Sequence, residues 1–583
     1  MIIENRIPIK SLNNTNLLNQ DVCVAGWVKK NRKLGNLCFL TLWDSSGSIQ
    51  IVDDSESSTF NLTNKLTRES VVMIAGKFQK RSNPNLDIPL GEYEIKINEV
   101  KVIAESKTPP LIIENETDAL EDVRLKYRYL DLRRPIMQDK LKLRFRFLQN
   151  VRNFLDSKEF IEIETPNFTK PTPEGARDYI VPTRIGPNRF YALPQSPQLY
   201  KQLLMISGFE RYFQIARCFR DEDGRKDRQP EHTQIDLEMS FVNENMIQKL
   251  IEEMFVYVFE KTLNIKLQTP FLKMKYKDAI NIYGSDKPDI RFELKLENVT
   301  TYFIDSEFQI FKKIANENGC INLINLSGHH IDNKQIKYLE KIAKDNFANG
   351  LAWITYENNQ IIDGSIKKFL DFEFIKKITN LSNKGSLLFI GHLKTLIVKK
   401  ALGAVRNALN ELYKLANNTY SFLWITDWPL YEWNDQIKKY ESAHNLFTAP
   451  KDMNIQNISE NDKENMLASS YDLVLNGFEL GSGAIRIHNP QDQLTIMKSL
   501  NLSDDEIKIK FGFLLEAYEY GAPFHGGMGL GLDRILMIIT NSQNIRDVIA
   551  FPKNAQGIDL MMDSPSEITD NDQLKDIFIE VKK

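Results

Sequence analysis

Residues 219–238 decide the fold we expect, and they read Phe-Arg-Asp-Glu-Asp-Gly-Arg-Lys-Asp-Arg-Gln-Pro-Glu-His-Thr-Gln-Ile-Asp-Leu-Glu. Apolar runs at 211–220 and 233–242 predict two β-strands, and the charged stretch between them predicts the loop that joins them. Alternate side chains of a strand point to opposite faces. The second strand therefore has an apolar face (Ile235, Leu237, Met239, Phe241) and a polar face (Gln234, Asp236, Glu238, Ser240).

A solvated hairpin is the simplest interpretation of this stretch. Two features favour a functional site instead. Arg220 ends an apolar strand, and the polar face of the returning strand carries two acids. A buried polar face needs a ligand or protein partners to satisfy it.

The flanking sequence predicts a mixed domain. Residues 139–160 form a helical pattern, a strand pattern at 160–166 stops at Pro166, and a second helix is predicted at 199–206. The first helix should bury one stripe: Leu141, Phe145, Leu148, Val151 and Leu155. Strands that follow helices without strict alternation indicate an α+β fold on an antiparallel sheet.

Residues 1–105 have a different pattern. Five short strands are predicted at 23–29, 37–42, 48–52, 71–78 and 93–102, which favours a small β-barrel of the OB type. Ser106-Lys-Thr-Pro-Pro110 breaks the pattern, so we expect a hinge over 106–135.

Residues 285–420 are rich in Lys and Asn and have strand and helix signals of their own. We therefore expect an inserted α/β domain that divides a catalytic domain into residues 136–284 and 421–560. The polar, acidic residues 561–583 are expected to form a C-terminal tail.

Composition excludes several classes of protein. The 583 residues are 42% hydrophobic with a net charge of −3, which excludes global disorder and an overall basic nucleic-acid binder. The four cysteines form no CxxC pair, which argues against a disulfide scaffold or structural zinc. The sequence contains neither an apolar run of membrane-spanning length nor an apolar leader. We expect a cytoplasmic protein without a membrane partner.

A second cluster lies at Gly526-Gly-Met-Gly-Leu-Gly-Leu-Asp-Arg534. Glycines at alternate positions let a strand backbone lie close to a flat ligand, and Arg534 at the start of a helix favours phosphate. The pattern lacks the third glycine of the dinucleotide fingerprint and is not a GxxxxGK[ST] phosphate loop.

Two further clusters are weaker. Asp472, Glu479 and Ser482 could supply oxygen ligands to Mg²⁺ beside ATP phosphates, although a strand pair with acids at its edge is equally consistent. Gln198 and Lys201 share a helix face, which alone is typical of a surface helix.

Together these clusters resemble the three signature motifs of class II aminoacyl-tRNA synthetases. The helix that ends at Glu164-Thr-Pro166 resembles motif 1, Phe219–Glu222 with its loop resembles motif 2, and Gly527–Arg534 resembles motif 3. Further segments resemble the bacterial form of the aspartyl branch, which carries the extra domain: Pro173–Asp178, Gln195–Gln198, Arg228–Glu231, Asn281–Asp289 and Asn544–Pro552.

The resemblance implies a role for each matching residue. Those implied to bind aspartate are Glu174, Ser196, Gln198, Lys201, Arg220, Asp236, His444 and Arg486. Those implied to bind ATP are Arg220, Asp221, Glu222, Gln229, Glu479, Gly531, Leu532, Asp533 and Arg534. Arg220, Glu479 and Arg534 are implied to be catalytic, and Asp472, Glu479 and Ser482 to hold Mg²⁺. Trp27, Arg32, Phe39 and Gln50 are implied to contact the tRNA anticodon.

The implied activity is ATP-dependent attachment of L-aspartate to tRNA by a homodimer. Several alternatives stay open: an enzyme that charges tRNA-Asp and tRNA-Asn, an asparaginyl or lysyl enzyme, a non-catalytic tRNA-binding paralogue, or an ATP-dependent amidating enzyme. One segment departs from the family pattern, because Asn-Leu-Phe447 follows His444 where many bacterial members have His-Pro-Phe.

Overall fold

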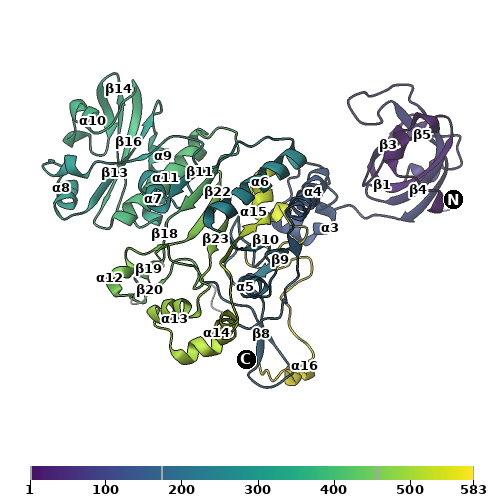
Figure 1. Ribbon diagram of the computed structural model, residues 1–583. Helices are drawn as coiled ribbons and strands as arrows, with labels where there is room; N and C mark the ends of the chain where they lie inside the picture. The colour runs from purple at the N-terminus through teal and green to yellow at the C-terminus, as the bar shows by residue number, and fades with distance from the viewer. Residues whose placement is uncertain (1–2, 172–174, 453–454, 456–457, 582–583) are drawn as a thin grey trace. The chain divides into compact units, whose positions relative to one another are not determined.

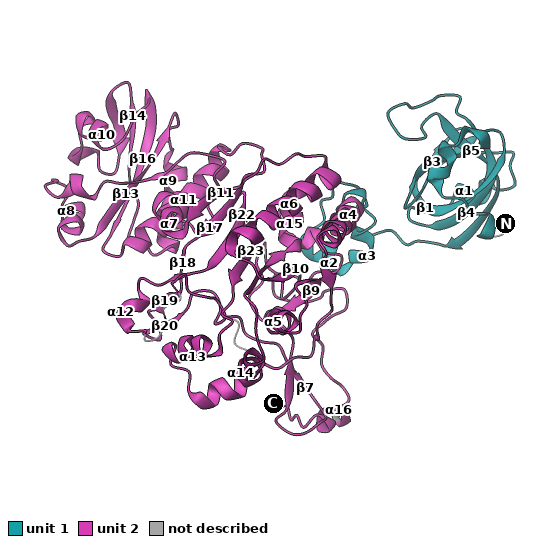
Figure 2. Ribbon diagram, viewed as in Figure 1, with its two compact units in different colours: residues 1–136 teal, residues 137–583 magenta. Residues whose placement is uncertain are grey.

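The computed structural model describes residues 3–171, 175–452, 455 and 458–581. The chain separates into two compact units, Met1–Ile136 and Met137–Lys583 (Figure 2). In the described residues no helix has the length and apolar character needed to cross a membrane.

The first unit is built on a closed five-stranded barrel with the order β1-β2-β3-β5-β4. Its strands are β1 (Asp21–Leu34), β2 (Leu37–Asp44), β3 (Gly47–Asp54), β4 (Val71–Lys80) and β5 (Tyr93–Ala104). All five predicted strands are present, so the expectation of a small barrel is confirmed. Three short helices complete the unit: α1 (Phe60–Thr63), α2 (Glu121–Lys126) and α3 (Arg128–Asp131). The last two lie in the segment predicted as a hinge.

The second unit is organised around an eight-stranded sheet with the order β11-β17-β22-β23-β24-β10-β9-β6 (Figure 1). The six central strands pair antiparallel, and the edge strands β11 and β6 are added in parallel. The strands are β6 (Ile161–Glu162), β9 (Arg211–Phe219), β10 (Glu231–Ser240), β11 (Leu272–Lys275), β17 (Phe422–Thr426), β22 (Ser470–Leu475), β23 (Phe478–Ile485) and β24 (His525–Gly531). Segments far apart in sequence thus form one sheet.

Helices α4 (Pro135–Ser157), α6 (Glu244–Leu263) and α15 (Leu532–Ile539) bury the apolar face of this sheet. The stripe predicted for the first helix was wrong at Phe145, which is 68% exposed. The helix instead turns Phe147, Val151, Phe154 and Leu155 into the core, because that face packs on the sheet. A second expectation was also wrong, since Phe241 lies beyond the end of β10 and is exposed.

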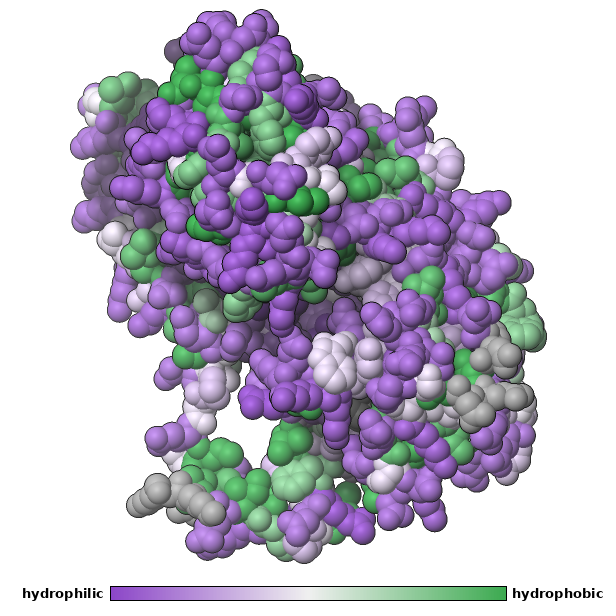
Figure 3. Space-filling model, turned by 90° about the vertical axis from the view of Figure 1, so that its left-hand side faces the viewer, coloured by the Kyte–Doolittle hydropathy of each residue, from purple (hydrophilic) through white to green (hydrophobic). Residues whose placement is uncertain are grey.

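A separate five-stranded sheet, ordered β12-β13-β16-β14-β15, lies within the second unit and is antiparallel throughout. Its strands are β12 (Leu296–Asn298), β13 (Cys320–Ser327), β14 (Ala352–Glu357), β15 (Gln360–Gly364) and β16 (Lys384–His392). Apolar clusters cover both faces. Associated helices are α7 (Tyr276–Tyr283), α8 (Gln309–Asn316), α9 (Asn333–Asp345), α10 (Phe372–Ile378) and α11 (Thr395–Tyr413). The outer surface on this side of the unit is mostly hydrophilic (Figure 3).

The remaining elements are short pairs and peripheral helices. The strand pairs are β7 (Ile180–Pro182) with β8 (Phe190–Ala192), β18 (Trp428–Pro429) with β21 (Leu467–Ala468), and β19 (Tyr431–Asn434) with β20 (Lys439–Ser442). The helices are α5 (Gln198–Ile206), α12 (Glu460–Lys463), α13 (Pro490–Ser499), α14 (Asp504–Glu519) and α16 (Asn571–Asp576). Helices α5, α13 and α14 share a small core of their own.

Candidate active site

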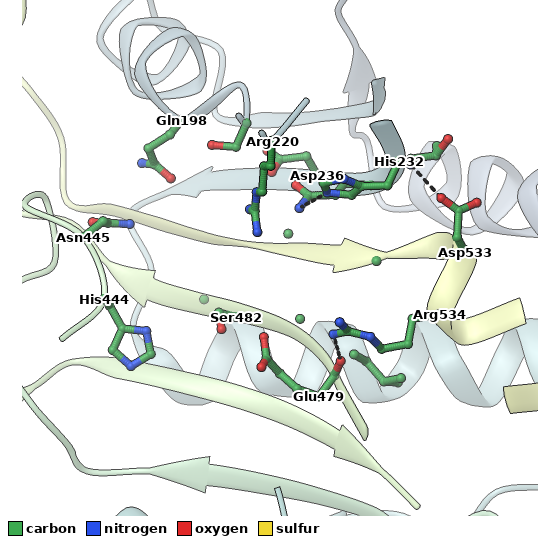
Figure 4. A pocket seen from close by; sticks show the side chains of 18 of the residues that line it. Gln198, Arg220, His232, Asp236, His444, Asn445, Glu479, Ser482, Asp533 and Arg534 are labelled. Carbon is green, nitrogen blue, oxygen red and sulfur yellow. Dashed lines mark hydrogen bonds between the residues drawn. The ribbon is translucent and has the colours of Figure 1, made fainter. Parts of the chain in front are cut away.

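A cavity of about 310 Å³ opens on the polar face of the eight-stranded sheet. Its lining comes mainly from α5, from the loop between β9 and β10 and the first half of β10, from the 444–448 loop, from β23 and β24, and from the start of α15. Arg220, Arg486 and Arg534 all line it, although the sequence places them up to several hundred residues apart. In Figure 4, Gln198, Arg220 and Asp236 lie on one side of the cavity, and Ser482 and Glu479 lie on the other. The structure therefore joins the predicted clusters in one site.

One end of the cavity is a buried group of two cations and two anions. Lys201 Nζ lies 3.0 Å from both Asp236 Oδ1 and Glu238 Oε2, and Arg486 Nε donates to Glu238 Oε1 at 3.0 Å. The four side chains are at most 3% exposed. Their formal charges cancel, which lets four ionised groups be buried together.

The two acids of this group respond differently to burial. Burial raises the pKa of Asp236, and the ammonium of Lys201 opposes the rise only in part. Burial acts in the same direction on Glu238, but the charges of Arg486 and Lys201 hold the pKa of Glu238 below its usual value. Glu238 was given no site role from the sequence. Its position two residues after Asp236 on the polar face was the signal that could have identified it.

Loop residues close the same end. The ring of His444 packs edge-on against that of Trp428, with the ring centroids 4.7 Å apart. The buried Nε2 of His444 has no hydrogen-bond partner in the described residues. Burial, with the charge of Arg486, lowers the pKa of His444 to about 4, so the ring is neutral at physiological pH. Asn445 Oδ1 accepts from Phe447 N and Thr448 Oγ1, which ties the divergent Asn-Leu-Phe447 segment into a turn.

The other predicted aspartate ligands fall into two groups. Ser196 and Gln198 line the cavity, and the buried Nε2 of Gln198 has no hydrogen-bond partner among the described residues. Glu174 lies outside the described residues.

Arg220 and Arg534 also line the cavity, and Arg534 lies at the opposite end from Gln198 and Asn445. Arg534 Nη1 donates to the carbonyl oxygen of Glu479 at 2.5 Å (dashed in Figure 4), and Nη2 lies 3.3 Å from Asp227 Oδ2. The buried Nε of Arg220 lacks a hydrogen-bond partner within the described chain. His232 lies near both, and burial together with Arg220 and Arg534 lowers the pKa of His232 to about 3. This end therefore offers guanidinium groups and a neutral imidazole to an anionic ligand.

Several predicted ATP ligands already have protein partners. Arg177 pairs with Asp221 at 2.5 Å, Arg228 pairs with Glu222 at 2.8 Å, and Gln229 Oε1 accepts from Lys553 N at 2.8 Å.

The strand-to-helix junction that follows β24 divides its residues between the cavity and the core. Gly531 lines the cavity at the N-cap of α15, but the Leu532 side chain is fully buried in the apolar core, so only its backbone can face a nucleotide. The carboxylate of Asp533 is bound by Arg144 and by Thr233 N.

The predicted metal ligands lie on adjacent strands, where Asp472 pairs with Ser482 across β22 and β23. Burial and the nearby charge of Glu479 raise the pKa of Asp472 well above its usual value, and its buried Oδ1 finds no hydrogen-bond donor in the described residues. Glu479 and Ser482 line the cavity. The described chain shows no group of three or more His, Cys, Asp or Glu arranged for a metal. The set fits a Mg²⁺ ion that takes its other ligands from phosphate and water.

Two glycines of β24 make room for the acids of β10. A Cβ at Gly527 would lie 2.2 Å from Glu238 Oε2, and one at Gly529 would lie 3.1 Å from Asp236 Oδ2. Gly529 and Gly531 also line the cavity, so close approach of this backbone to a ligand stays a prediction.

The barrel of the first unit carries a basic groove. It is lined by Lys30, Asn31, Arg32, Lys33, Asn64, Leu66 and Arg68, with a volume of about 630 Å³. The other predicted anticodon residues lie on the strands of the barrel. Phe39 of β2 is the register partner of Arg32 of β1, and the Gln50 side chain donates to Glu94 at 2.8 Å. Trp27 stacks on Trp43, with the ring centroids 5.0 Å apart. The Asn31 side chain is used to hold the loop carbonyls of Thr63 and Leu66.

Comparison with known proteins agrees with this architecture. Residues 120–555 match the family model "tRNA synthetases class II (D, K and N)", and residues 22–103 match "OB-fold nucleic acid binding domain". One similar solved structure is described as a putative aspartyl-tRNA synthetase from Leishmania major. The match covers 95% of this chain and 94% of the other chain, with a TM-score of 0.59 and 20% sequence identity, and it supports the fold. The fold and the family model define a class II aminoacyl-tRNA synthetase.

Related proteins of similar sequence indicate to which branch of this class the chain belongs. Aspartate–tRNA ligase of Malacoplasma penetrans is 49% identical over 571 residues, which span 97% of each chain. Aspartate–tRNA(Asp/Asn) ligase of Thermoanaerobacter sp. is 46% identical over 96% of this chain and 95% of its own. This chain belongs to the aspartate–tRNA ligase family of class II tRNA synthetases.

Proposed function

We propose that the chain attaches L-aspartate to tRNA in two steps. The aspartate α-carboxylate attacks the α-phosphorus of ATP to give aspartyl-adenylate and pyrophosphate, and a ribose hydroxyl at the tRNA 3′ end then takes the aspartyl group and releases AMP. The observation that carries the proposal is the single cavity that joins Arg486 and Lys201 at one end to Arg220 and Arg534 at the other.

The amino-acid end recognises aspartate by charge. We assign the substrate's side-chain carboxylate to Arg486 and Lys201, and its α-ammonium group to Asp236. Glu238 holds both cations at 3.0 Å before the substrate enters, so the site does not have to order them on binding. Asparagine would turn an NH₂ group towards Arg486, and a mismatch between two donors of this kind can discriminate by several orders of magnitude.

The nucleotide end supplies charge stabilisation rather than a nucleophile. Arg220 directly follows the last residue of β9, and its buried Nε has no hydrogen-bond partner among the described residues. Arg220 is assigned to the α-phosphate, where negative charge develops. Arg534 is assigned to the nucleotide and is aimed by its bonds to Glu479 and Asp227. Asp472, Glu479 and Ser482 would hold Mg²⁺, which would neutralise phosphate charge when bound. Both substrates are thereby aligned in one cavity.

The barrel is assigned to tRNA. Its basic groove suits phosphate contacts, and aromatic side chains beside basic ones suit stacked, unpaired bases. We assign Phe39 to stacking and Gln50 to a base edge.

The assembly and the compartment are also proposals. A homodimer is supported by the exposed apolar residues on and around α4: Ile136, Phe145 and Ile161. A cytoplasmic location is supported by the need for tRNA and ATP, and it suits the four cysteines, which form no disulfide in the described chain.

The direct test is amino-acid-dependent exchange between ATP and pyrophosphate, followed by charging of purified tRNAs. We expect exchange with aspartate and not with asparagine or lysine. Exchange with asparagine alone would overturn the assignment. Charging of both tRNA-Asp and tRNA-Asn would favour the dual specificity named for the Thermoanaerobacter relative.

A further inference from the structure

A partly buried hydrogen-bond network lies at the nucleotide end of the cavity and is not used by the mechanism above. Arg144, on α4, donates through Nη1 to Asp533 Oδ1 and through Nη2 to Thr233 Oγ1 at 3.0 Å. The other carboxylate oxygen of Asp533 accepts from Thr233 N at 2.9 Å (Figure 4). The Arg144 side chain is 19% exposed and that of Asp533 is 2% exposed.

This network connects three segments that border the cavity. Thr233 follows His232 on β10, and Asp533 precedes Arg534 in the first turn of α15. Val548 is the last residue of a short turn that begins at Ile545, which lines the cavity. The Val548 carbonyl oxygen also accepts from Arg144 Nη1 at 3.4 Å. One guanidinium group thus fixes the start of α15 against β10 and the 545–548 turn.

The geometry of the bonds indicates a role beyond packing. The N-cap of α15, Gly531, has no side chain to cap the helix, so the direction of its first turn depends on other contacts. An arginine presents a planar fork of donors that binds a carboxylate in a defined orientation. A buried ion pair often contributes little net stability compared with apolar packing, while it specifies geometry.

We propose that Arg144 is a positioning residue for the nucleotide: it fixes Asp533 and thereby the orientation of the Arg534 guanidinium. The proposal rests on the proposed function, because it needs Arg534 to contact ATP. It also assigns Asp533, which the sequence implied to be an ATP ligand, to the protein side of the site.

The experiment measures the KM for ATP, the KM for aspartate and kcat in aspartate-dependent ATP–pyrophosphate exchange, for the full chain and for Arg144→Gln and Arg144→Lys. Arg152→Gln is the matched control, because Arg152 lies on the same helix and pairs with Glu162 at 2.9 Å on the surface. We expect Arg144→Gln to raise the KM for ATP about tenfold or more, since a charge-assisted hydrogen bond is lost. The KM for aspartate should stay within about twofold, and Arg152→Gln should match wild type.

Asp533→Asn keeps the experiment decisive if Arg144→Gln is poorly folded. We expect the Asn variant alone to raise the KM for ATP, and the double variant to be no worse than the more impaired single variant, because both changes break one bond. An unchanged KM for ATP in folded Arg144→Gln, or equal increases in both KM values, would overturn the proposal. Wild-type protein without any aspartate-dependent exchange would instead reject the proposed function itself.

Discussion

The two large sheets of the second unit differ in the side chains that they bury on their faces. In the five-stranded sheet, neighbouring residues of β16 enter apolar clusters on opposite faces, as Leu388 and Phe389 do. In the eight-stranded sheet, Leu237 of β10 enters the apolar core, while Asp236 and Glu238 on either side of it are buried on the opposite, polar face, where Asp236 lines the cavity. Both sheets are buried on two faces, but one uses a face for ionised groups.

The comparison shows what a buried polar face requires. Ionised groups are costly to bury unless opposite charges and hydrogen bonds compensate them. The cavity face meets this requirement with Lys201 and Arg486, while Asp472 Oδ1 remains without a partner among the described residues. Among the side chains with a buried atom that has no partner in the described residues, Gln198 and Arg220 are assigned to substrates and Asp472 to Mg²⁺. Substitutions on the two sheets should therefore separate function from stability.

The largest effect is expected from Arg486→Leu. We expect aspartate-dependent pyrophosphate exchange to fall at least about 1,000-fold in kcat/KM, because the substrate carboxylate loses its paired, charge-assisted bonds. The chain should remain folded at reduced stability, since Lys201 alone is left to balance the buried carboxylates of Asp236 and Glu238. Circular dichroism and steady-state exchange kinetics test both points. Exchange near the wild-type rate would contradict the assignment.

The opposite result is expected from Leu388→Ala in the five-stranded sheet. Truncation of this fully buried side chain should lower the free energy of unfolding by about 3 kcal/mol. The KM values for ATP and aspartate should not change. Leu237→Ala is the counterpart on β10, where a similar loss of stability should be accompanied by a higher KM for aspartate. Urea unfolding and exchange kinetics distinguish the two variants, and a KM effect in Leu388→Ala would remove the distinction between the sheets.

A smaller effect is expected from Glu479→Gln. The amide keeps the size of the side chain but removes the charge, so kcat should fall about 100-fold and the Mg²⁺ concentration that gives half-maximal exchange should rise. Chelation with EDTA should abolish exchange in the wild type, and added Mg²⁺ should restore it. An unaltered Mg²⁺ dependence in the variant would exclude Glu479 as a ligand.

The smallest effect concerns pH. The pKa of His444 is lowered to about 4, below its value of about 6.5 in an unfolded chain, so between these values the unfolded chain binds more protons. Its contribution to stability is complete above about pH 6.5 and is lost as the pH falls towards 4. His444→Gln should reduce this acid-induced loss by about 2 kcal/mol at pH 5. Urea unfolding at pH 8, where the ring is neutral in both states, is the control. The account is refuted if the free energy of unfolding changes with pH equally in the variant and the wild type.

Much of the fold could be predicted because it depends on short-range patterns. Strand alternation identified the five barrel strands and the polar face of β10, and helical spacing placed Gln198 and Lys201 together at the start of α5. The predicted helix at the start of the second unit was correct in position, with Val151 and Leu155 buried as predicted, but wrong at Phe145, because Phe145 satisfies the helical period as well as Phe147 does. Periodicity defines a stripe, while the neighbouring sheet selects which stripe is buried.

Local sequence patterns specify most of the elements and which of them carry charge, because hydrophobic spacing acts over a few residues. The meeting of particular charges depends on the folded chain: Glu238 with Arg486, Arg144 with Asp533, and Glu479 with Arg534. The folded chain also places Leu532 in the core and lets the glycines of β24 make room for the acids of β10. These pairings join residues 55 to 389 positions apart. Electrostatic partners are fixed by proximity in the folded sheet, and proximity over such separations is set by strand order rather than by local pattern.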